Sequence, residues 1–370
     1  MSGAIRRLYR GDNRYRFIER RRRWYTASGV IIAACVISLI FRGFNYGIEF
    51  AGGTQFQILT SGTSVTTTEV NDAFRTANVS SAEAAQAVGS GSTRQIRVRS
   101  AALTPPEQQR VVASVANSVH VSPLKISTQS VSSVWGHDIT VKAIEGLIVF
   151  LIVVSIYISI RFQWRMAVGG ILALLHDLIV AAGIYSIIGF EVTPSTVVGL
   201  LTILGFSLYD TVVVYDKVAE NSRDLLAGSR MTYSDAANLA VNQTLMRSIN
   251  TSLIALLPVA GLLFVGVGLL GVGTIKDLAL VLFVGLASGA YSSLFLATPI
   301  VVELTEREPA YKALAKRVEA KRSSEAARAA AAVAAEPAMA GADAPAPARR
   351  AGGPAPAPRP GARPQRRRRR

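Results

Sequence analysis

The sequence predicts a polytopic α-helical membrane protein with six transmembrane helices and one external α+β ferredoxin-like domain between helices 1 and 2. Half of the 370 residues are hydrophobic and only 17% are charged, against roughly 25% in soluble domains. The mean hydropathy is +0.34, so apolar residues must be concentrated where water does not reach. Six stretches have the roughly 20 mostly apolar residues that a helix needs to cross a bilayer. They are 24–41, 139–160, 166–188, 195–216, 249–270 and 277–302.

Lysine and arginine fall on one side of these spans. They crowd the segment 1–23, the links after spans two and four, and the tail, whereas the loops around Glu191 and before Lys276 contain none. Because short loops rich in Lys and Arg stay in the cytoplasm, both termini are expected to be cytoplasmic. The net charge of +16 is therefore mainly a topology signal, and no specific nucleic-acid binding is expected. The first span is expected to remain as an anchor, because FRGFNYG offers no small-x-small cleavage site.

The segment 42–138 differs from the spans and is expected to form the external domain. Its alternating and helical patterns predict four strands and two helices. These are strands at 53–60, 83–89, 93–100 and 125–134 and helices at 66–78 and 104–120. The resulting β-α-β-β-α-β order is that of a ferredoxin-like domain. Such a domain leaves a sheet face or edge where an extended peptide can dock, but a plain spacer domain is an open alternative.

The two ends of the chain also differ from the spans. Residues 1–23 are expected to form a basic cytoplasmic segment, and 303–336 combine helix formers with mixed charge, which predicts a cytoplasmic helical segment. Residues 337–370 are rich in Ala, Pro and Arg and have too few bulky apolar residues to fold, so a disordered tail is expected. The run Arg366–Arg370 predicts contact with anionic lipid headgroups, with RNA or an acidic partner as alternatives.

Charged side chains inside the spans are functional candidates, because a charge in a bilayer is expensive. Asp210 lies about 10 Å from the Lys217 end of span four, and the pair His176-Asp177 lies about 16 Å into span three, at 1.5 Å per residue. Arg247 lies just before span five, which is antiparallel to span four, so its side chain can extend towards Asp210. Carboxylates, a fixed cation and nearby hydroxyls are typical of a proton path. The alternative is a set of polar contacts that only hold the helices together.

Other kinds of site are excluded. The single cysteine, Cys35, rules out an internal disulfide or a cysteine zinc cluster, and three scattered histidines make no metal site, so no cofactor is expected. Asp177 and Asp210 lack the GxGD-type loop of a membrane aspartic protease, and no Walker loop is present, so no enzymatic activity is expected. In span six, Gly285 and Gly289 have the small-xxx-small spacing that allows close helix packing.

Five segments together carry a resemblance to a known family. They are NYGIEFAGGTQF, ALLHDLI, GLLTILGFSLYDTVVVYDKVAENSR, NQTLMRSINTS and ASGAYSSLFLATPIV. Through them the chain, from about residue 24 to 305, resembles the SecF family of protein-export membrane subunits in the resistance-nodulation-division superfamily. The residues that fit the family's motif at the start of the external domain are Gly47, Glu49, Phe50, Gly52, Gly53 and Thr54.

This resemblance implies a role in protein export across the bacterial cell membrane. The family pairs with SecD beside the SecYEG channel, cooperates with the ATPase SecA and often YajC, and uses the proton gradient to help draw unfolded exported polypeptide to the outer side. By motif, Asp210 would be the proton-relay carboxylate and Arg247 its positively charged partner. Many relatives have Asn before that Asp. Here the residue is Tyr209, which together with the basic tail is similar to the actinobacterial branch.

Two other functions remain open from the sequence. One is a non-transporting membrane scaffold, in which the buried charges serve assembly alone. The other is a half-size proton-driven exporter of the same superfamily, which would need a larger external region than the segment 42–138 supplies.

Overall fold

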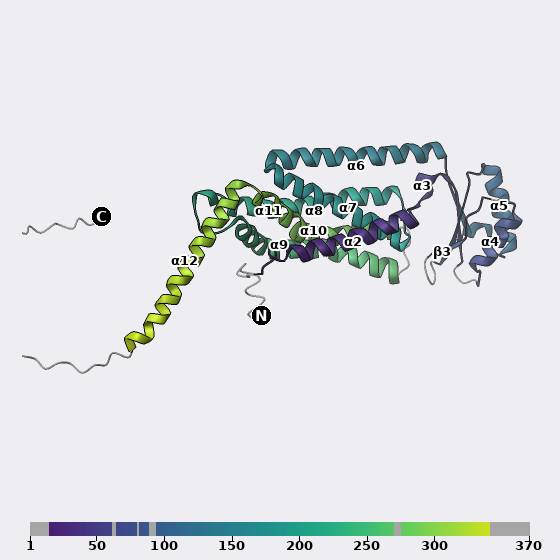
Figure 1. Cartoon of the computed structure of the whole chain (residues 1–370). Coiled ribbons are helices and arrows are strands. Elements are labelled where there is room, and N and C mark those ends of the chain that lie inside the picture. The colour runs from purple at the N-terminus through teal and green to yellow at the C-terminus, as the bar shows by residue number, and fades with distance from the viewer. Residues whose placement is uncertain (1–14, 61–63, 80, 89–93, 270–274, 341–370) are drawn as a thin grey trace, which may run out of the picture. The chain divides into compact units, whose positions relative to one another are not determined.

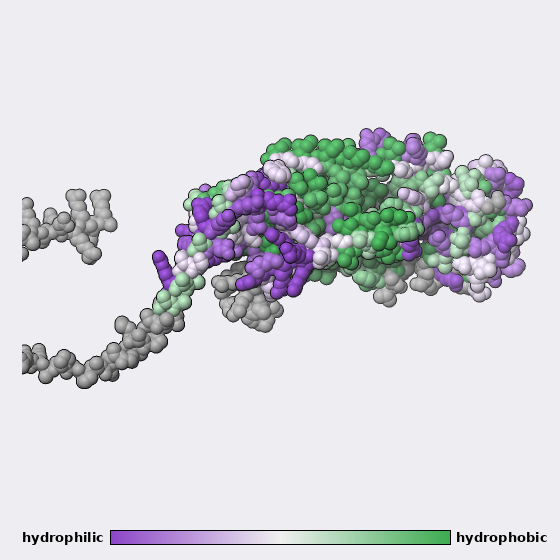
Figure 2. All heavy atoms as spheres, viewed as in Figure 1, coloured by the Kyte–Doolittle hydropathy of each residue, from purple (hydrophilic) through white to green (hydrophobic). Residues whose placement is uncertain are grey.

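Six long apolar helices dominate the computed structural model (Figure 1), which describes residues 15–60, 64–79, 81–88, 94–269 and 275–340. Within these residues, six helices are long and apolar enough to cross a membrane, as predicted. Apolar side chains cover the helices in Figure 2, while polar side chains gather on the domain that holds α4 and α5 and at the opposite end of the bundle. The bounds are α2 (Arg21–Arg42), α6 (Ser133–Arg161), α7 (Trp164–Ile188), α8 (Pro194–Asn221), α9 (Tyr233–Ala260) and α10 (Lys276–Ser292).

Two of these helices continue with a change of winding. After α9 the chain forms a π-helical segment, η4 (Gly261–Leu269), and α10 passes through a π-helical turn, η6 (Ser293–Ala297), into α11 (Thr298–Glu306). Short π-helical turns are rare and occur often at functional sites. Span six of the sequence is therefore three helical pieces in the structure, and its π-helical turn was not predicted.

Helix starts differ most from the predicted boundaries. The helix α6 begins at Ser133 because the Ser132 hydroxyl accepts the Trp135 N–H at 3.2 Å, an N-cap; the predicted span began at 139. The helix α9 begins at Tyr233 rather than 249, because its first half is polar and a search for apolar stretches misses it. A capping box between Thr232 and Asp235 satisfies backbone N–H groups at the start of α9.

Polar residues in the first half of α9 bind the chain that leads into α2. The Asn238 side chain accepts the Phe17 N–H at 2.8 Å, and Asn242 accepts the Tyr15 N–H at 3.1 Å. Both amides also donate to the Tyr15 carbonyl, each at 2.9 Å. Ile18 in this segment is only 1% exposed. The end of the segment 1–23 is thus anchored to the bundle, and residues 1–14 lie outside the described part.

The helices α8 and α10 pack against each other through glycine. A Cβ atom on Gly285 would lie 1.9 Å from the Ile203 side chain, and one on Gly289 would lie 2.9 Å from the Cβ of Ser207. Such distances are far below van der Waals contact, so only glycine allows this approach. The close packing brings the polar faces of the two helices together at the depth of Ser207.

A domain of two helices and four strands lies between α2 and α6, and we refer to it as the α/β domain (residues 53–131). Its elements are β2 (Gly53–Leu59), α4 (Thr67–Thr76), β3 (Gln86–Val88), β4 (Gln95–Ser100), α5 (Pro105–Ser118), the short helix η2 (Pro123–Lys125) and β5 (Ile126–Val131). The strands form one antiparallel sheet in the order β3-β4-β2-β5. Phe56 and Phe74 are buried between sheet and helices, with ring centroids 5.1 Å apart.

A small joint connects the α/β domain to the bundle. It consists of β1 (Asn45–Tyr46) and α3 (Ile48–Ala51), with β1 pairing in parallel with β6 (Glu191–Val192) in the α7–α8 loop. The Gly47 N–H extends this pairing by donating to the Val192 carbonyl at 2.8 Å. The sequence did not predict this pair, because two-residue strands carry no periodic signal.

The C-terminal region is helical as far as the structure describes it. The helix α12 (Pro309–Ala340) covers most of the predicted helix 303–336 and also residues 337–340, which we predicted to be tail. The chain divides into two compact units, Met1–Val318 and Glu319–Arg370. In the first unit, Leu314 and Val318 are buried in the bundle core. The rest of the predicted tail, including Arg366–Arg370, lies outside the described residues.

Candidate functional site

Asp177 lies in the middle of α7 with only 1% of its surface exposed. Three serine hydroxyls donate to its carboxylate: Ser207 and Ser292 to Oδ2 at 2.6 and 2.7 Å, and Ser288 to Oδ1 at 2.7 Å. Ser288 and Ser292 are four residues apart and therefore lie on the same face of α10. Neutral hydroxyls from two other helices thus surround this buried carboxylate.

His176 directly precedes Asp177 on α7, and its imidazole contacts the Asp177 carboxylate. Its Nδ1 lies 3.1 Å from Asp177 Oδ1, and the side chain is 3% exposed. Its Nε2 is buried and has no hydrogen-bond partner among the described residues. The imidazole ring lies 5.9 Å from the Tyr291 ring, measured between centroids. His176 and Asp177 therefore form one buried pair with a free nitrogen.

Asp210 on α8 is the second buried carboxylate, 8% exposed. The Ser248 hydroxyl of α9 donates to its Oδ1 at 2.7 Å, and the Ser293 hydroxyl of η6 donates to its Oδ2 at 2.6 Å. Within the described residues, neither Asp210 nor Asp177 forms an ion pair with a lysine or arginine. Burying a carboxylate charge without a cation is costly, and the serine hydroxyls are the groups of the described chain that offset this cost.

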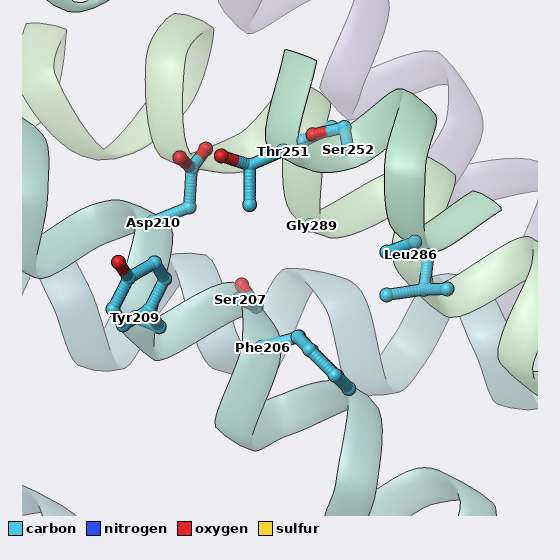
Figure 3. A pocket seen from close by; sticks show the side chains of 10 residues that line it. Phe206, Ser207, Tyr209, Asp210, Thr251, Ser252, Leu286 and Gly289 are labelled. Carbon is cyan, nitrogen blue, oxygen red and sulfur yellow. The ribbon is translucent and has the colours of Figure 1, made fainter. Parts of the chain in front are cut away.

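A pocket opens beside Asp210 between α8, α9 and α10, and Figure 3 shows its lining side chains. Its volume is about 30 Å³, which is room for about one or two water molecules. The residues that line it are Phe206, Ser207, Tyr209, Asp210, Thr251, Ser252, Ala255, Leu286, Gly289 and Ala290. The polar groups among them can hold water next to the carboxylate.

Arg247 does not contact Asp210 in this structure. Its side chain is exposed at the surface of α9 and donates to the Tyr209 hydroxyl at 3.2 Å. Tyr209 precedes Asp210 on α8, so the cation is connected to the carboxylate's helix through a phenol. The predicted approach of Arg247 to Asp210 is therefore not a direct ion pair here.

The Gly-rich motif lies at the joint between the α/β domain and the bundle. Gly52 has φ +72° and Gly53 has φ +118°, values at which side chains are unfavourable. A Cβ on Gly52 would lie 2.9 Å from the Ser133 backbone at the start of α6. Thr54 follows and accepts the Leu103 N–H at 3.0 Å. The motif lets the chain turn sharply where α3, β2 and α6 meet.

The remaining motif residues lie within this joint. Gly47 caps the start of α3, and a Cβ there would lie 2.5 Å from a Glu49 carboxylate oxygen. The Phe50 carbonyl lies 2.6 Å from the place a Cβ of Gly136 would occupy. These contacts explain the motif residues by local packing at the joint, and none of the contacts involves the buried carboxylates.

Two arginines of β4 enclose Glu191 of the α7–α8 loop. Arg97 Nη1 lies 3.2 Å from Glu191 Oε1, and Arg99 Nη2 lies 2.7 Å from the same oxygen. All three side chains are largely buried, with 9–12% exposure. Arg99 also donates to the Tyr46 carbonyl at 2.8 Å. We refer to Arg97, Arg99 and Glu191 as the joint ion cluster; it connects the α/β domain directly to the loop before α8.

Sequence reasoning missed most of the groups that contact the buried acids. The sequence predicted nearby hydroxyls only as a group and assigned none to an acid. Ser248 directly follows Arg247, and four further serines were not singled out. These are Ser207, Ser288, Ser292 and Ser293. The only available signal was their spacing: Ser207 precedes Asp210 by one helical turn, and Ser288 and Ser292 repeat at one turn.

The fold and this site together define a class: a polytopic helical membrane protein with buried acids shared between helices. Residues 111–307 match the family described as protein export membrane protein SecD/SecF, C-terminal, and residues 37–64 match the SecD/SecF GG motif. The first match spans more than half of the chain. The chain therefore belongs to the SecD/SecF family of protein-export membrane proteins.

Relatives agree with this assignment. The chain is 45% identical to the protein translocase subunit SecF of Streptomyces coelicolor over 325 residues, which are 87% of this chain and 85% of that protein. It is also 45% identical to SecF of Mycobacterium tuberculosis, over 86% of this chain and 74% of that protein. The crystal structure of SecDF from Thermus thermophilus superposes with a TM-score of 0.68 at 30% identity, over 80% of this chain and 39% of that chain. The chain thus spans about two fifths of the length of SecDF.

Proposed function

We propose that this chain is a proton-driven accessory subunit of the Sec translocase that pairs with SecD and assists late movement of exported polypeptide. The observation that carries the proposal is Asp210, an acid buried between three helices and bound only by serine hydroxyls among the described residues. A proton removes the cost of burying its charge. Repeated loading and release of that proton gives the helices two states.

The available energy is sufficient to bias a conformational change. One proton that crosses a gradient of 150–200 mV releases about 3.5–4.6 kcal/mol. That amount shifts an equilibrium by about two and a half to three and a half powers of ten. It is close to the roughly 5.5 kcal/mol that a change from 1:99 to 99:1 requires. Transport of a single proton per step therefore suffices to favour one pose of a domain over another.

A direct structural route connects Asp210 to the α/β domain. The helix α8 starts at Pro194, directly after the loop that holds Glu191, and reaches Asp210 after about 24 Å at 1.5 Å per residue. Glu191 is held by Arg97 and Arg99 of the domain. A small movement of α8 is thereby passed to the joint. We assign the domain to the ferredoxin-like type, on its β-α-β-β-α-β order.

The distribution of basic residues supports the orientation. We place both termini in the cytoplasm and the α/β domain on the outer side of the bacterial cell membrane, following the rule that basic loops remain inside. The domain is then positioned to contact unfolded polypeptide as it emerges. The tail Arg366–Arg370 would face the inner leaflet, whose anionic lipids attract arginine.

Partners follow from the family. The SecDF protein of Thermus thermophilus unites in one chain a part similar to this one and a further part, which supports pairing with a separate SecD here. SecYEG, SecA and YajC are proposed as the neighbouring components of the export machine. We propose no enzymatic reaction, cofactor or nucleic-acid ligand for this chain.

Proton flux tests the proposal. The chain and its SecD partner are reconstituted in liposomes, and proton uptake is followed after an imposed gradient. Asp210→Asn is expected to abolish uptake while the pair still forms. Asp216→Asn is the matched control, because Asp216 lies on the same helix but is half exposed and bound to Arg161 at 2.7 Å. Unchanged uptake in Asp210→Asn would overturn the proposal and favour the non-transporting scaffold.

The exporter alternative fits the site less well. The pocket beside Asp210 is about 30 Å³, whereas pockets that hold drug-sized ligands are roughly 300–1,000 Å³. Water fits the pocket at Asp210 and a drug or lipid does not; an apolar pocket of about 330 Å³ between α9 and α10 has the larger size, but Asp210 does not line it. Recovery of SecD and SecYEG on purification in mild detergent, without solute transport, would separate the two functions.

A further inference from the structure

The serines that bind the two buried acids lie on shared helical segments. Ser207 lies one turn before Asp210 on α8, yet its hydroxyl donates to Asp177 on α7 at 2.6 Å. Ser292 and Ser293 are adjacent, and they donate to different acids: Ser292 to Asp177 at 2.7 Å and Ser293 to Asp210 at 2.6 Å. A displacement of α8 or of the chain around Ser292 therefore changes the surroundings of both acids.

The division between Ser292 and Ser293 falls where the helix changes winding. Ser292 is the last residue of α10 and Ser293 the first of the π-helical turn η6. Successive residues on a helix point in directions roughly 100° apart, so neighbours can serve acids on two different helices. Both serines are fully buried, and their hydroxyls find these partners rather than water.

His176 and Asp177 offer a place for a second proton. Nδ1 lies within hydrogen-bond distance of Asp177 Oδ1 at 3.1 Å, so in the neutral ring it carries the hydrogen and Nε2 carries a lone pair. That Nε2 is buried and unpartnered among the described residues. A proton that binds there forms one N–H bond and converts imidazole to imidazolium. The net charge of the pair then changes from −1 to 0, and no other bond changes.

The groups that face the pair leave His176 Nε2 as the atom that accepts a proton. From α8 and α10, Ser207, Ser288 and Ser292 all donate to Asp177 and solvate its negative charge. The Tyr291 ring is the other titratable group packed on His176, and its hydroxyl already shares a hydrogen bond with Ser28 of α2 at 3.0 Å. Asp210 is the remaining acid of the cluster, and no lysine or arginine of the described chain pairs with either acid.

We propose that His176 and Asp177 form a second proton-binding pair, with the proton at His176 Nε2, and that Ser207, Ser292 and Ser293 are positioning residues that couple this pair to Asp210. The inference rests on the proposed proton-driven function and assigns it a second site. Protonation at Asp210 and at His176 are then linked through the backbone, because Ser207 binds Asp177 from the helix that carries Asp210, and the adjacent Ser292 and Ser293 bind one acid each.

Nitrogen-15 NMR of histidine tests the assignment directly. The full chain is labelled on its three histidines, reconstituted with its SecD partner in lipid, and measured from acid to alkaline pH. The signal of Nε2 that disappears in His176→Gln is expected to show reversible protonation. In Asp177→Asn that signal is expected to stay neutral over the same range. A His176 signal that never protonates in the wild type would overturn the proposal.

Proton flux tests the coupling. His176→Gln is expected to lower flux at least tenfold, while the matched change His120→Gln, on an exposed residue of the α/β domain, leaves it unchanged. Ser292→Ala is expected to lower flux several-fold and Ser292→Thr, which keeps a hydroxyl, to restore it; Ser186→Ala is the control for a buried serine bound to Ser38 instead. Equal flux in Ser292→Ala and wild type would refute the positioning role.

The two proposals fail in different ways. If Asp210→Asn abolishes flux but His176→Gln does not, the proton-driven function stands and the second site is wrong. If the His176 signal titrates but Asp210→Asn conducts normally, the second site stands and the role of Asp210 in the proposed function is wrong.

Discussion

Removal of the charge at Glu191 is expected to loosen the α/β domain from the bundle. In the joint ion cluster, Glu191 is the only acid that approaches both Arg97 and Arg99 within 4 Å among the described residues. The change Glu191→Gln keeps the shape but leaves two largely buried guanidinium groups without their shared counter-charge. Breaking a buried ion pair in this way costs about 3–5 kcal/mol.

Hydrogen exchange of the β1–β6 joint measures this effect. The Gly47 N–H donates to the Val192 carbonyl at 2.8 Å, so its exchange reports opening of the joint. A loss of 3–5 kcal/mol corresponds to faster exchange by about two to four powers of ten. The bundle peptides around α7 and α10 are expected to exchange as in the wild type, because the change affects the joint alone.

The matched control contacts the same arginine. Glu83 lies 4.0 Å from Arg99 but is 61% exposed, and an exposed pair contributes only about 0–1 kcal/mol. Glu83→Gln should therefore alter exchange at the joint by less than tenfold. Equal exchange in Glu191→Gln and wild type, or an equally large effect of Glu83→Gln, would refute the role of the joint ion cluster.

Three further predictions concern stability. Gly285→Ala forces a Cβ into the Ile203 side chain and should destabilise the helix bundle by about 1–3 kcal/mol. The control Gly205→Ala places a Cβ where no atom lies within 4 Å, so it should be neutral or stabilising. Denaturant unfolding of the two variants compares these effects. Hydrogen bonds from the Thr104 hydroxyl and N–H lower the pKa of Glu107. This cap therefore stabilises α5 fully above the unfolded-state pKa of about 4.3, and the stabilisation is lost as the pH falls through the lower folded-state pKa. Melting curves measured against pH should lose that dependence in Glu107→Gln. Asn238→Ala removes a carbonyl that binds the chain before α2, and limited proteolysis of that segment should accelerate; unchanged cleavage would contradict the anchoring.

The membrane helices could be predicted because composition alone determines them. Spans such as 166–188 agree closely with α7, since a bilayer requires a long apolar run and such a run leaves few alternatives. The start of α9 could not be predicted in this way. Its polar first half, with Asn238 and Asn242, is explained by contacts with a segment more than two hundred residues away.

The α/β domain was predictable for a different reason. Turn and capping residues punctuate it, as at Thr66 and Pro105, and each of its two helices begins at such a signal. The ends of its strands differ from the prediction by a few residues. The predicted strand 83–89 is Gln86–Val88 in the structure, and the predicted strand 125–134 ends at Val131. The Ser132 cap explains the second shift, because it starts α6 where the alternation still favoured a strand.

The candidate site was predicted only in its acids. A buried Asp in an apolar helix is conspicuous, so Asp177 and Asp210 were identified from the sequence. The serines were not, because serine is common in membrane helices and its partner depends on how the helices pack. Whether Arg247 contacts Asp210 depends likewise on the direction of the arginine side chain, which the sequence does not give. In the structure that side chain donates to Tyr209.

The most direct test of the central claim follows export after ATP is exhausted. Membrane vesicles that contain the SecYEG channel and SecA, and in which this chain is paired with SecD, are loaded with a half-exported polypeptide, ATP is removed, and a proton gradient is imposed. We expect the wild-type chain and Asp216→Asn to complete export, and Asp210→Asn to stop where ATP was removed. Gradient-driven completion of export in Asp210→Asn would contradict the claim that a proton at Asp210 drives the step.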